Sequence, residues 1–360
     1  MGYQGQVSSK EISSERVFGL DLVRTISFYT IAAHHFTVTL WKTPGNFSPY
    51  RYSSTIWNLI EEEARLLSFS GHTVLFLTSL LIAYTAKNHE KALRIIPILL
   101  IMWFLSSLFD ASSDSFFFAW DIFPLIAVGM GLSYFFTLLF PKPISFWLLS
   151  VLGFLLMSVP FWRFQVLQQL PLYPRHILIG DCPNDLSDWP ILPWVGLVLW
   201  GYGIGCLIKE YPTKLAQFSK KELYAWTLLL AWTPMYWGTY YKMLLGSHYS
   251  CESMRQEPVA FLAHLFGIMF ILRLCFLQIV NNFFKRFSLA RFISGLEINI
   301  NFGMAYFYHF ILISMLIYIF NPTLAASPWF SAFISFLLLP LTEISLRLFK
   351  IIFRLFKTSS

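Results

Sequence analysis

Arg24 and His35 are the two residues whose types and spacing most directly suggest chemistry. They lie in the apolar run 18–40, which is long enough to cross a bilayer, where an ionisable side chain is costly unless it is shielded or used. Eleven residues of helix turn through about 1100°, so both side chains share one helix face about 16 Å apart along the axis. A cation and an imidazole on one face predict a functional site inside the membrane.

Asp21 offers a second interpretation of Arg24, because charges three residues apart can pair on one helix face. In that case Arg24 belongs to a structural ion pair, and a phosphate-binding role passes to Arg94. Alternatively, Arg24 acts in the functional site itself. We expect this functional role, and charge reversal of Asp21 would distinguish it from a structural ion pair.

The elements that must position these residues are transmembrane helices. Hydrophobic residues make up 56% and charged residues only 12% of the 360 residues, and apolar stretches recur along the whole chain. This composition argues against a soluble protein. We predict an all-α, polytopic bundle of about ten transmembrane helices at 18–40, 66–86, 95–109, 118–140, 144–161, 189–208, 223–245, 259–281, 298–320 and 329–349.

The distribution of Lys and Arg predicts the orientation of the bundle. If the N-terminus lies in the cytoplasm, most of the 26 basic residues fall in cytoplasmic segments, and both termini are cytoplasmic. The net charge of +7 then belongs to the cytoplasmic face and does not indicate binding of nucleic acid. We therefore expect a multi-pass protein of the inner (cytoplasmic) membrane, in contact with membrane lipids.

One membrane domain is expected, at 18–349, between a cytoplasmic N-terminal segment (1–17) and a basic tail (350–360). The polar N-terminal segment has no small-residue cleavage site, which favours a retained signal anchor. In the tail, basic and apolar residues alternate. This pattern fits either an amphipathic helix on the inner leaflet or charge that only sets the topology.

The four cysteines have two predicted uses. Cys206 and Cys275 fall in spans and are expected to pack as small apolar residues. Cys182 and Cys251 fall in outer loops and could form a disulfide if that compartment is oxidising.

Basic residues at the predicted inner ends of the spans form a candidate phosphate site. They are Arg24 near the inner end of the first span, Lys91 and Arg94 at the start of the third, and Arg273 toward the inner end of the eighth. Guanidinium groups match phosphate oxygens in bidentate geometry, so the set predicts a site for a polyphosphate headgroup. The alternatives are that Lys91 and Arg94 only set topology and that Arg273 extends its charge to the interface.

Titratable residues gather at a similar depth in the predicted outer half, namely His34, His35, His72, Asp121 and Asp188. A neutral imidazole held by a carboxylate can remove a proton from a hydroxyl or an amine. A hydrogen-bonded structural histidine is the competing interpretation for His72, and also for His264 and His309. His35 is favoured because it shares its face with Arg24.

Several segments resemble one family. The stretch Gly19-Leu-Asp21-Leu-Val-Arg24, followed by ten residues and His35, resembles the opening helix of the acyltransferase-3 superfamily. Arg94-Ile-Ile-Pro97 resembles the start of that family's third helix, and Tyr306-Phe-Tyr-His309-Phe310 resembles its late aromatic helix. Residues 188–196 and Asp121-Ile-Phe resemble segments of the related heparan-α-glucosaminide N-acetyltransferase branch.

The resemblance implies an O-acyltransferase that takes an acetyl group from cytoplasmic acetyl-CoA. The basic residues Arg24, Arg94, Lys91 and Arg273 would then bind the phosphates of this co-substrate, and no metal is expected. His35 would act as the base with His34 beside it, and Asp121 or Asp188 would orient it or stabilise charge. A covalent acyl-histidine intermediate is the alternative to direct transfer.

The acceptor implied by the resemblance is an extracytoplasmic glycan, either lipid-linked or at the surface, such as a lipopolysaccharide O-chain. Trp189, His72 and His309 are the candidates for acceptor contact, although an aromatic belt accounts for the outer tryptophans equally well. A transporter or flippase with a buried proton or substrate site is the rival function, and a scaffold is a third. The oligomeric state is left open.

Overall fold

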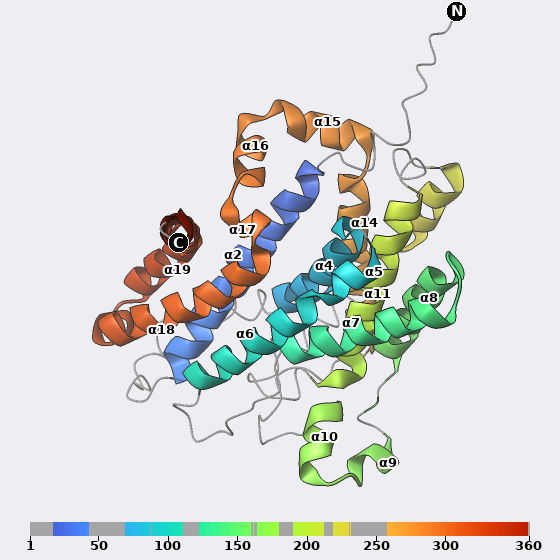
Figure 1. The fold of residues 1–360 in the computed structure, drawn as a ribbon, viewed down its shortest axis with the longest axis horizontal. Helices are drawn as coiled ribbons and strands as arrows, with labels where there is room; N and C mark the ends of the chain where they lie inside the picture. The colour runs from blue at the N-terminus through green and yellow to red at the C-terminus, as the bar shows by residue number, and fades with distance from the viewer. Residues whose placement is uncertain are drawn as a thin grey trace, which may run out of the picture. The chain divides into compact units, whose positions relative to one another are not determined.

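The computed structural model describes residues 17–42, 69–86, 88–110, 122–159, 161, 164–179, 190–211, 219–229, 231 and 258–358. In these residues every long element is a helix, which confirms the all-α prediction (Figure 1). The helices are α2 (Phe18–Lys42), α4 (Phe69–Thr85), α5 (His89–Leu93), α6 (Ile95–Asp110), α7 (Ile122–Leu139), α8 (Ile144–Ser158), α9 (Gln165–Gln168), α10 (Leu172–Ile179), α11 (Ile191–Glu210), α14 (Pro258–Cys275), α15 (Gln278–Arg286), α16 (Ser288–Ser294), α17 (Glu297–Ile300), α18 (Phe302–Ala326) and α19 (Pro328–Thr358).

Four stretches of helix are long and apolar enough to cross a membrane: Ile122–Leu139, Ile191–Glu210, Gly303–Phe320 and Trp329–Ile352. Each matches a predicted span. Helices α4, α6 and α8 also fall on predicted spans, but they have only 17, 16 and 15 residues. A membrane protein is therefore supported, whereas the number of ten spans and the cytoplasmic position of the termini stay predictions.

Three predicted spans differ in detail from the helices. The eighth is divided, because α14 ends at Cys275 and the next residues form the separate helix α15, whose sequence QIVNNFFKR is too polar for the bilayer interior. The ninth is divided into α17 and α18 at Asn301. The tenth is longer than predicted, because α19 continues without a break through the expected tail to Thr358.

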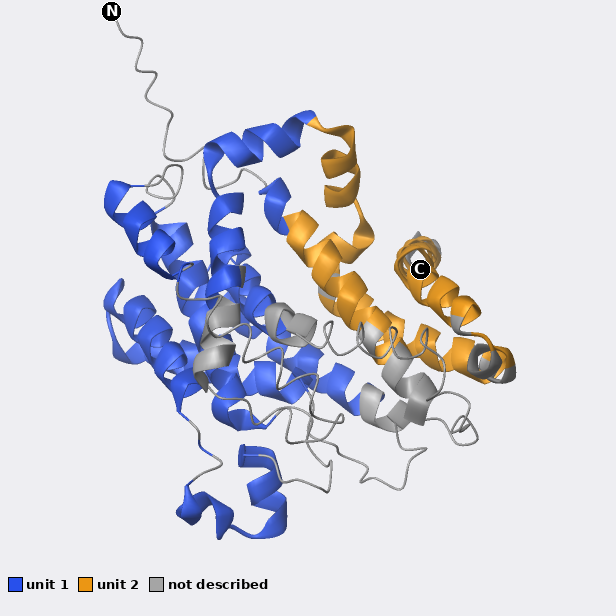
Figure 2. Cartoon of the chain, turned by 180° about the vertical axis from the view of Figure 1, so that it is seen from behind, with its two compact units in different colours: residues 1–20, 75–286 blue, residues 21–74, 287–360 orange. Residues whose placement is uncertain are grey.

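The chain forms two compact units (Figure 2). Unit 1 contains residues 1–20 and 75–286, and unit 2 contains residues 21–74 and 287–360. Each unit therefore combines two segments that are separated in the sequence, and each is described by itself below.

Close backbone contacts around α11 hold unit 1 together. Helix α11 packs on α8 and α7. A Cβ atom added at Gly203 would lie 2.5 Å from the Ser150 hydroxyl of α8, and one added at Gly205 would lie 2.3 Å from the Leu80 carbonyl oxygen of α4. Small residues allow such approach between membrane helices, where packing replaces the hydrophobic effect as the driving force.

The core of unit 2 is built around one face of α2. Phe28, Ala32 and Phe36 are spaced four residues apart, so they lie along one side of this helix, and all are almost fully buried. They pack in a cluster with apolar residues of α17, α18 and α19: Ile298, Ala305, Ile313, Ile317, Ile334, Leu338 and Leu346. This cluster determines which α2 residues face the interior of unit 2.

Candidate active site

His35 and His309 meet in unit 2. The Nδ1 atom of His35 lies 2.9 Å from the Nε2 atom of His309, a hydrogen bond between residues 274 positions apart. The two rings are stacked, with centroids 5.2 Å apart. His309 is fully buried and His35 is partly buried. His35 and His309, which the sequence analysis considered as separate candidates, thus form one pair.

Helical periodicity explains why both side chains point inward. His35 follows Ala32 by three residues, which places it on the core-facing side of α2. His309 lies four residues after Ala305 and four before Ile313, so it lies on the buried face of α18. The imidazoles are therefore positioned by the same apolar pattern that forms the core of unit 2.

The pair can both accept and donate a proton. A neutral imidazole has one N–H and one lone pair, so only one ring can donate the hydrogen bond between Nδ1 of His35 and Nε2 of His309. If His35 donates, its Nε2 atom carries a lone pair and can act as a base. If His309 donates, Nε2 of His35 carries the proton and can act as an acid.

Aromatic side chains hold the two imidazoles in place. The Phe310 ring stacks on His35 at 4.6 Å, and the edge of Tyr306 meets His309 at 4.9 Å. Phe28 of α2 makes a further edge contact with His309 at 5.6 Å. Packing on several sides limits ring rotation, which keeps the hydrogen bond between the histidines formed.

Arg24 and His35 lie on the same uninterrupted helix, as predicted. The Nη1 atom of Arg24 lies 3.5 Å from Oδ1 of Asp21, and the two side chains are 15% and 7% exposed. The ion pair that the spacing suggested is therefore present. Next to it, Asn299 donates a 2.8 Å hydrogen bond to the Thr25 hydroxyl, which ties α2 to the start of α17.

Glu343 organises a polar network in unit 2 that we did not predict. Its carboxylate accepts hydrogen bonds from the backbone N–H groups of Glu297 at 3.0 Å and Ile298 at 3.1 Å, the first turn of α17. It also accepts a 2.6 Å bond from Arg347. The Glu297 side chain in turn pairs with Lys350 at 2.5 Å. The sequence did contain a signal for this network. Glu343 is an acidic residue inside the predicted tenth span, and acidic residues within membrane spans usually have a structural or functional role.

Arg273 is bound to an acidic partner in unit 1. Its Nε and Nη2 atoms donate to the two carboxylate oxygens of Glu222 at 2.6 and 3.1 Å. The guanidinium is 8% exposed and the carboxylate 30%. This bidentate geometry occupies the face of the guanidinium that would otherwise match a phosphate.

A cavity of about 420 Å³ lies beside this ion pair. Its lining is apolar and aromatic apart from Arg273 and Glu222. It includes residues of α4, α8, α11 and α14 and of segments outside these helices: Phe76, Leu80, Trp147, Ile204, Leu207, Ile208, Tyr211, Trp226, Met269, Leu272 and Phe276. Such a cavity suits an apolar or weakly polar chain.

Lys91 and Arg94 are exposed in unit 1, at α5 and at the start of α6. Cys206 and Cys275 are buried free thiols, which confirms their predicted packing role. Among the residues described, no group of three His, Cys, Asp or Glu side chains is arranged to hold a metal ion.

Several predicted residues lie outside what the structure describes. Asp121, Asp188 and Trp189 are among them, and so are Cys182 and Cys251. His34, His72 and His264 belong to described helices, but their side chains are not described. The predicted orientation of His35 by a carboxylate thus remains a prediction, whereas its contact with another histidine is observed.

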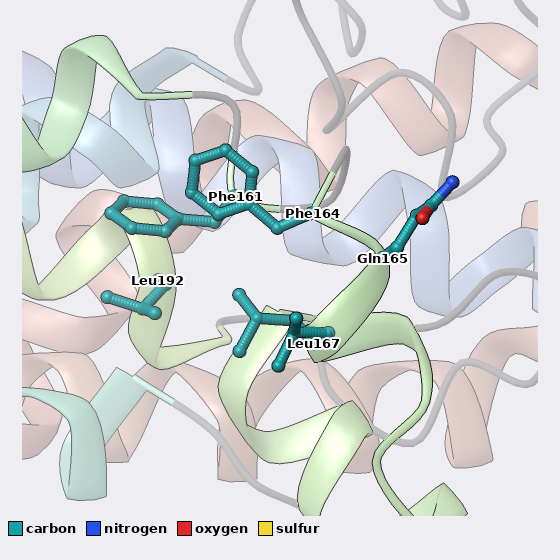
Figure 3. A pocket seen from close by; sticks show the side chains of 6 residues that line it. Phe161, Phe164, Gln165, Leu167 and Leu192 are labelled. Carbon is teal, nitrogen blue, oxygen red and sulfur yellow. The ribbon is translucent and has the colours of Figure 1, made fainter.

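A second cavity in unit 1, of about 590 Å³, lies where α8 ends and α11 begins. Phe161, Phe164 and Gln165 line it together with Val166, Leu167 and Leu192 (Figure 3). The two phenylalanine rings meet edge to face, with centroids 5.8 Å apart. The segment from 161 to 167 belongs to the connection that the charge pattern predicts to be on the outer side.

Comparison with known proteins identifies a family. No curated protein and no solved structure matches the chain. The family model described as heparan-alpha-glucosaminide N-acetyltransferase, catalytic, matches residues 16–235, which is more than half of the chain and includes Arg24, His35 and Arg94. Of the two related groups that the sequence resembles, the match supports the heparan-α-glucosaminide N-acetyltransferase branch. His309 lies outside the matched residues. The chain therefore belongs to the heparan-alpha-glucosaminide N-acetyltransferase catalytic family.

Proposed function

We propose that this chain is an integral membrane acetyltransferase that moves an acetyl group from cytoplasmic acetyl-CoA to a hydroxyl group of an extracytoplasmic glycan. The observation that carries the proposal is the partly buried hydrogen bond between His35 and His309. Family membership supports the acetyltransferase class. The donor, the acceptor and the site residues are our proposal.

In the proposed reaction the acceptor hydroxyl attacks the thioester carbonyl. Nε2 of His35 takes the hydroxyl proton as the new C–O bond forms, and the resulting imidazolium is stabilised by its hydrogen bond to His309. The tetrahedral intermediate then expels the thiolate of coenzyme A, and the same proton passes from His35 to the sulfur. Proton and electrons balance without a metal or another co-substrate.

His309 serves in this scheme as the positioning residue. Held by Tyr306 and Phe310 at ring distances of 4.9 and 4.3 Å, it selects the tautomer of His35 through the Nδ1 hydrogen bond. A second histidine thus takes the place that a carboxylate often occupies next to a catalytic base. Asp121 and Asp188 remain proposed contributors of charge.

For the donor, the proposed phosphate contacts are Lys91 and Arg94 first. Arg24 and Arg273 are weaker candidates, because Asp21 is paired with the first and Glu222 binds the second. The apolar cavity beside Arg273 is suited to the pantetheine arm of the donor. For the acceptor, the proposed contacts are His72 and Trp189, since His309 is fully buried against His35. The aromatic cavity near Phe161 and Phe164 adds two ring faces on which a sugar could stack.

The test is acetyl transfer in membranes supplied with labelled acetyl-CoA, at matched expression. We expect His35→Ala to lower transfer by about 100-fold or more, the usual contribution of a general base. His309→Gln should lower it by about tenfold, since a glutamine amide can still bond to the His35 ring but cannot select its tautomer equally well. Tyr318→Phe is the matched control, because Tyr318 lies on the same helix and is 89% exposed.

Each result decides a separate part of the proposal. Full transfer by His35→Ala would remove the site, and equal transfer by His309→Gln and wild type would remove the role of the pair. Label released from the glycan by mild base indicates an ester, whereas base-resistant label indicates an amide and an amine acceptor. Absence of transfer by wild type to any glycan tested would favour a transporter.

A further inference from the structure

Helix α15 (Gln278–Arg286) has one apolar side and one polar side. Successive residues of a helix are about 100° apart around its axis. The apolar residues of α15 therefore fall within an arc of about 140°: Ile279, Val280, Phe283 and Phe284. The polar residues occupy the rest of the circumference: Gln278, Asn281, Asn282, Lys285 and Arg286. A helix with this separation is expected to bury one side and expose the other.

The apolar side of α15 is the side that faces outward. Ile279 is 77% exposed and Phe283 is 55% exposed, whereas Asn281 on the polar side is buried. The Oδ1 atom of Asn281 accepts a 3.0 Å hydrogen bond from the backbone N–H of Phe18, at the start of α2. A helix on the surface of a soluble protein has the opposite arrangement, with its apolar side turned inward. The outward side of α15 therefore fits apolar surroundings.

The position of α15 indicates what these surroundings are. Helix α15 follows α14, which lies in the predicted eighth span, and it runs across the direction of α14 (Figure 1). Gly19 lets this end of α14 pack against the start of α2, because a Cβ atom there would lie 2.8 Å from the Sγ atom of Cys275. The distribution of Lys and Arg predicts that this end is cytoplasmic. Helix α15 is thus expected at the surface of the inner leaflet.

Arg286 ends α15 at the border between its two sides. Seven residues of helix turn through about 700°, so Arg286 lies about 20° from Ile279 around the axis. Arg286 is exposed, as is Lys285 before it. In a helix that lies on a bilayer, this border is at the level of the lipid headgroups. The anionic lipids of a cytoplasmic leaflet attract cations at that level.

We propose that α15 is an interfacial helix that binds anionic lipid of the cytoplasmic leaflet. Ile279 and Phe283 lie among the acyl chains, and Arg286 lies against the headgroup phosphates. A second copy of this chain fits the surface less well. A stable dimer buries about 800 Å² on each partner, whereas even a large aromatic side chain buries only about 150–250 Å².

The first experiment identifies what the two sides of α15 touch in the full chain, held in nanodiscs that contain phosphatidylglycerol. A photoreactive benzoylphenylalanine replaces either Ile279 or Gln278, and the products of irradiation are identified by mass spectrometry. Gln278 is the matched control, because it is the exposed neighbour of Ile279 on the polar side. We expect lipid adducts at position 279 and at most one tenth as many at position 278.

The alternatives give different products. Equal lipid adducts at the two positions would contradict a lipid-facing side of α15. Crosslinks from position 279 to a second copy of the chain would assign this surface to a dimer, and the absence of any lipid adduct would likewise overturn the proposal. Neither outcome depends on acetyl transfer.

The second experiment tests the headgroup contact by native mass spectrometry of the purified protein with phosphatidylglycerol and phosphatidylcholine. We expect Arg286→Gln to lower the preference for phosphatidylglycerol by about fivefold, the effect of one cation near an anionic surface. Arg286→Lys keeps the positive charge and should keep most of the preference. An equal preference in wild type and Arg286→Gln would overturn the role of Arg286.

Discussion

Two regions of the molecule differ in how their basic residues are paired. Three positive side chains of unit 2 are paired with carboxylates: Arg24 with Asp21 at 3.5 Å, Arg347 with Glu343 at 2.6 Å and Lys350 with Glu297 at 2.5 Å. Arg273 of unit 1 is paired in the same way with Glu222 at 2.6 Å. At the cytoplasmic end predicted for unit 1, His89 and Lys142 have no such partner among the described residues. Burial, and then the positive charges of Lys142 and Lys209, lower the pKa of His89.

This difference separates structural charge from charge that remains available to a ligand. A buried carboxylate that accepts backbone and guanidinium hydrogen bonds, as Glu343 does, contributes to the fold. A cluster of like charges lowers the stability of the free protein and is relieved only when an anion binds. The position of a basic residue at the end of a membrane span does not by itself show whether its charge serves the fold or a ligand.

Glu343→Ala should have the largest effect on stability. It removes the acceptor of the Glu297 and Ile298 N–H groups and of Arg347, so buried donors lose their partners. We expect a loss of about 3 kcal/mol, measured by chemical unfolding in detergent. Glu343→Gln keeps one acceptor oxygen and should lose less. Equal stability of Glu343→Ala and wild type would show that the network does not hold unit 2 together.

Arg273→Ala should have an intermediate effect. Because Glu222 is 30% exposed, water can replace part of the lost hydrogen bonding, and we expect a loss of about 1–2 kcal/mol. Arg273→Lys should recover only part of it, since an ammonium cannot form two parallel bonds to one carboxylate. A lysine variant as stable as wild type would mean that the bidentate geometry is unimportant.

His89 should give a small dependence of stability on pH. Its pKa is lower in the folded protein than the usual 6.5, so the unfolded chain binds the proton first as the pH falls. The stability that the folded protein has with a neutral His89 is therefore lost progressively as the pH drops below about 6.5. His89→Gln should show a smaller decrease in melting temperature between pH 7.5 and pH 5.5. An unchanged slope would contradict the influence of Lys142 and Lys209 on this imidazole.

Lys142→Gln should have the smallest effect on stability. The side chain is exposed, and its only described contact is with the face of Phe146, so we expect a change within about 0.5 kcal/mol. Its melting temperature without ligand should match wild type or rise slightly, because repulsion with His89 is removed. A marked loss of stability would make Lys142 structural and weaken the contrast between the two regions.

Where the structure describes the predicted spans they are helical, although the eighth and ninth are each divided. Arg24 and His35 lie on one helix, and Cys206 and Cys275 are packing residues, because each conclusion depended on local apolar pattern. The division of the eighth span at Cys275 was missed, although the polar residues from Gln278 onward carried that information.

The partners of the candidate residues were less predictable. His309 was expected among contacts to the acceptor, but the structure places it against His35 from a segment 274 residues away. Glu343 and Glu222 were not considered at all. Nothing in the local pattern around Arg273 indicates which carboxylate will reach it.

The amino-acid sequence by itself determined the all-helical class, most helix positions and the face of α2 that carries Arg24 and His35. These features follow from hydrogen bonds four residues apart and from apolar periodicity, which are local. Only the tertiary structure decided that His35 meets His309, that Glu343 holds the start of α17, and that His89 and Lys142 lie near the same Phe146 ring. Such contacts depend on how helices distant in sequence pack, and that is decided by the shapes of whole faces, such as the glycines of α11.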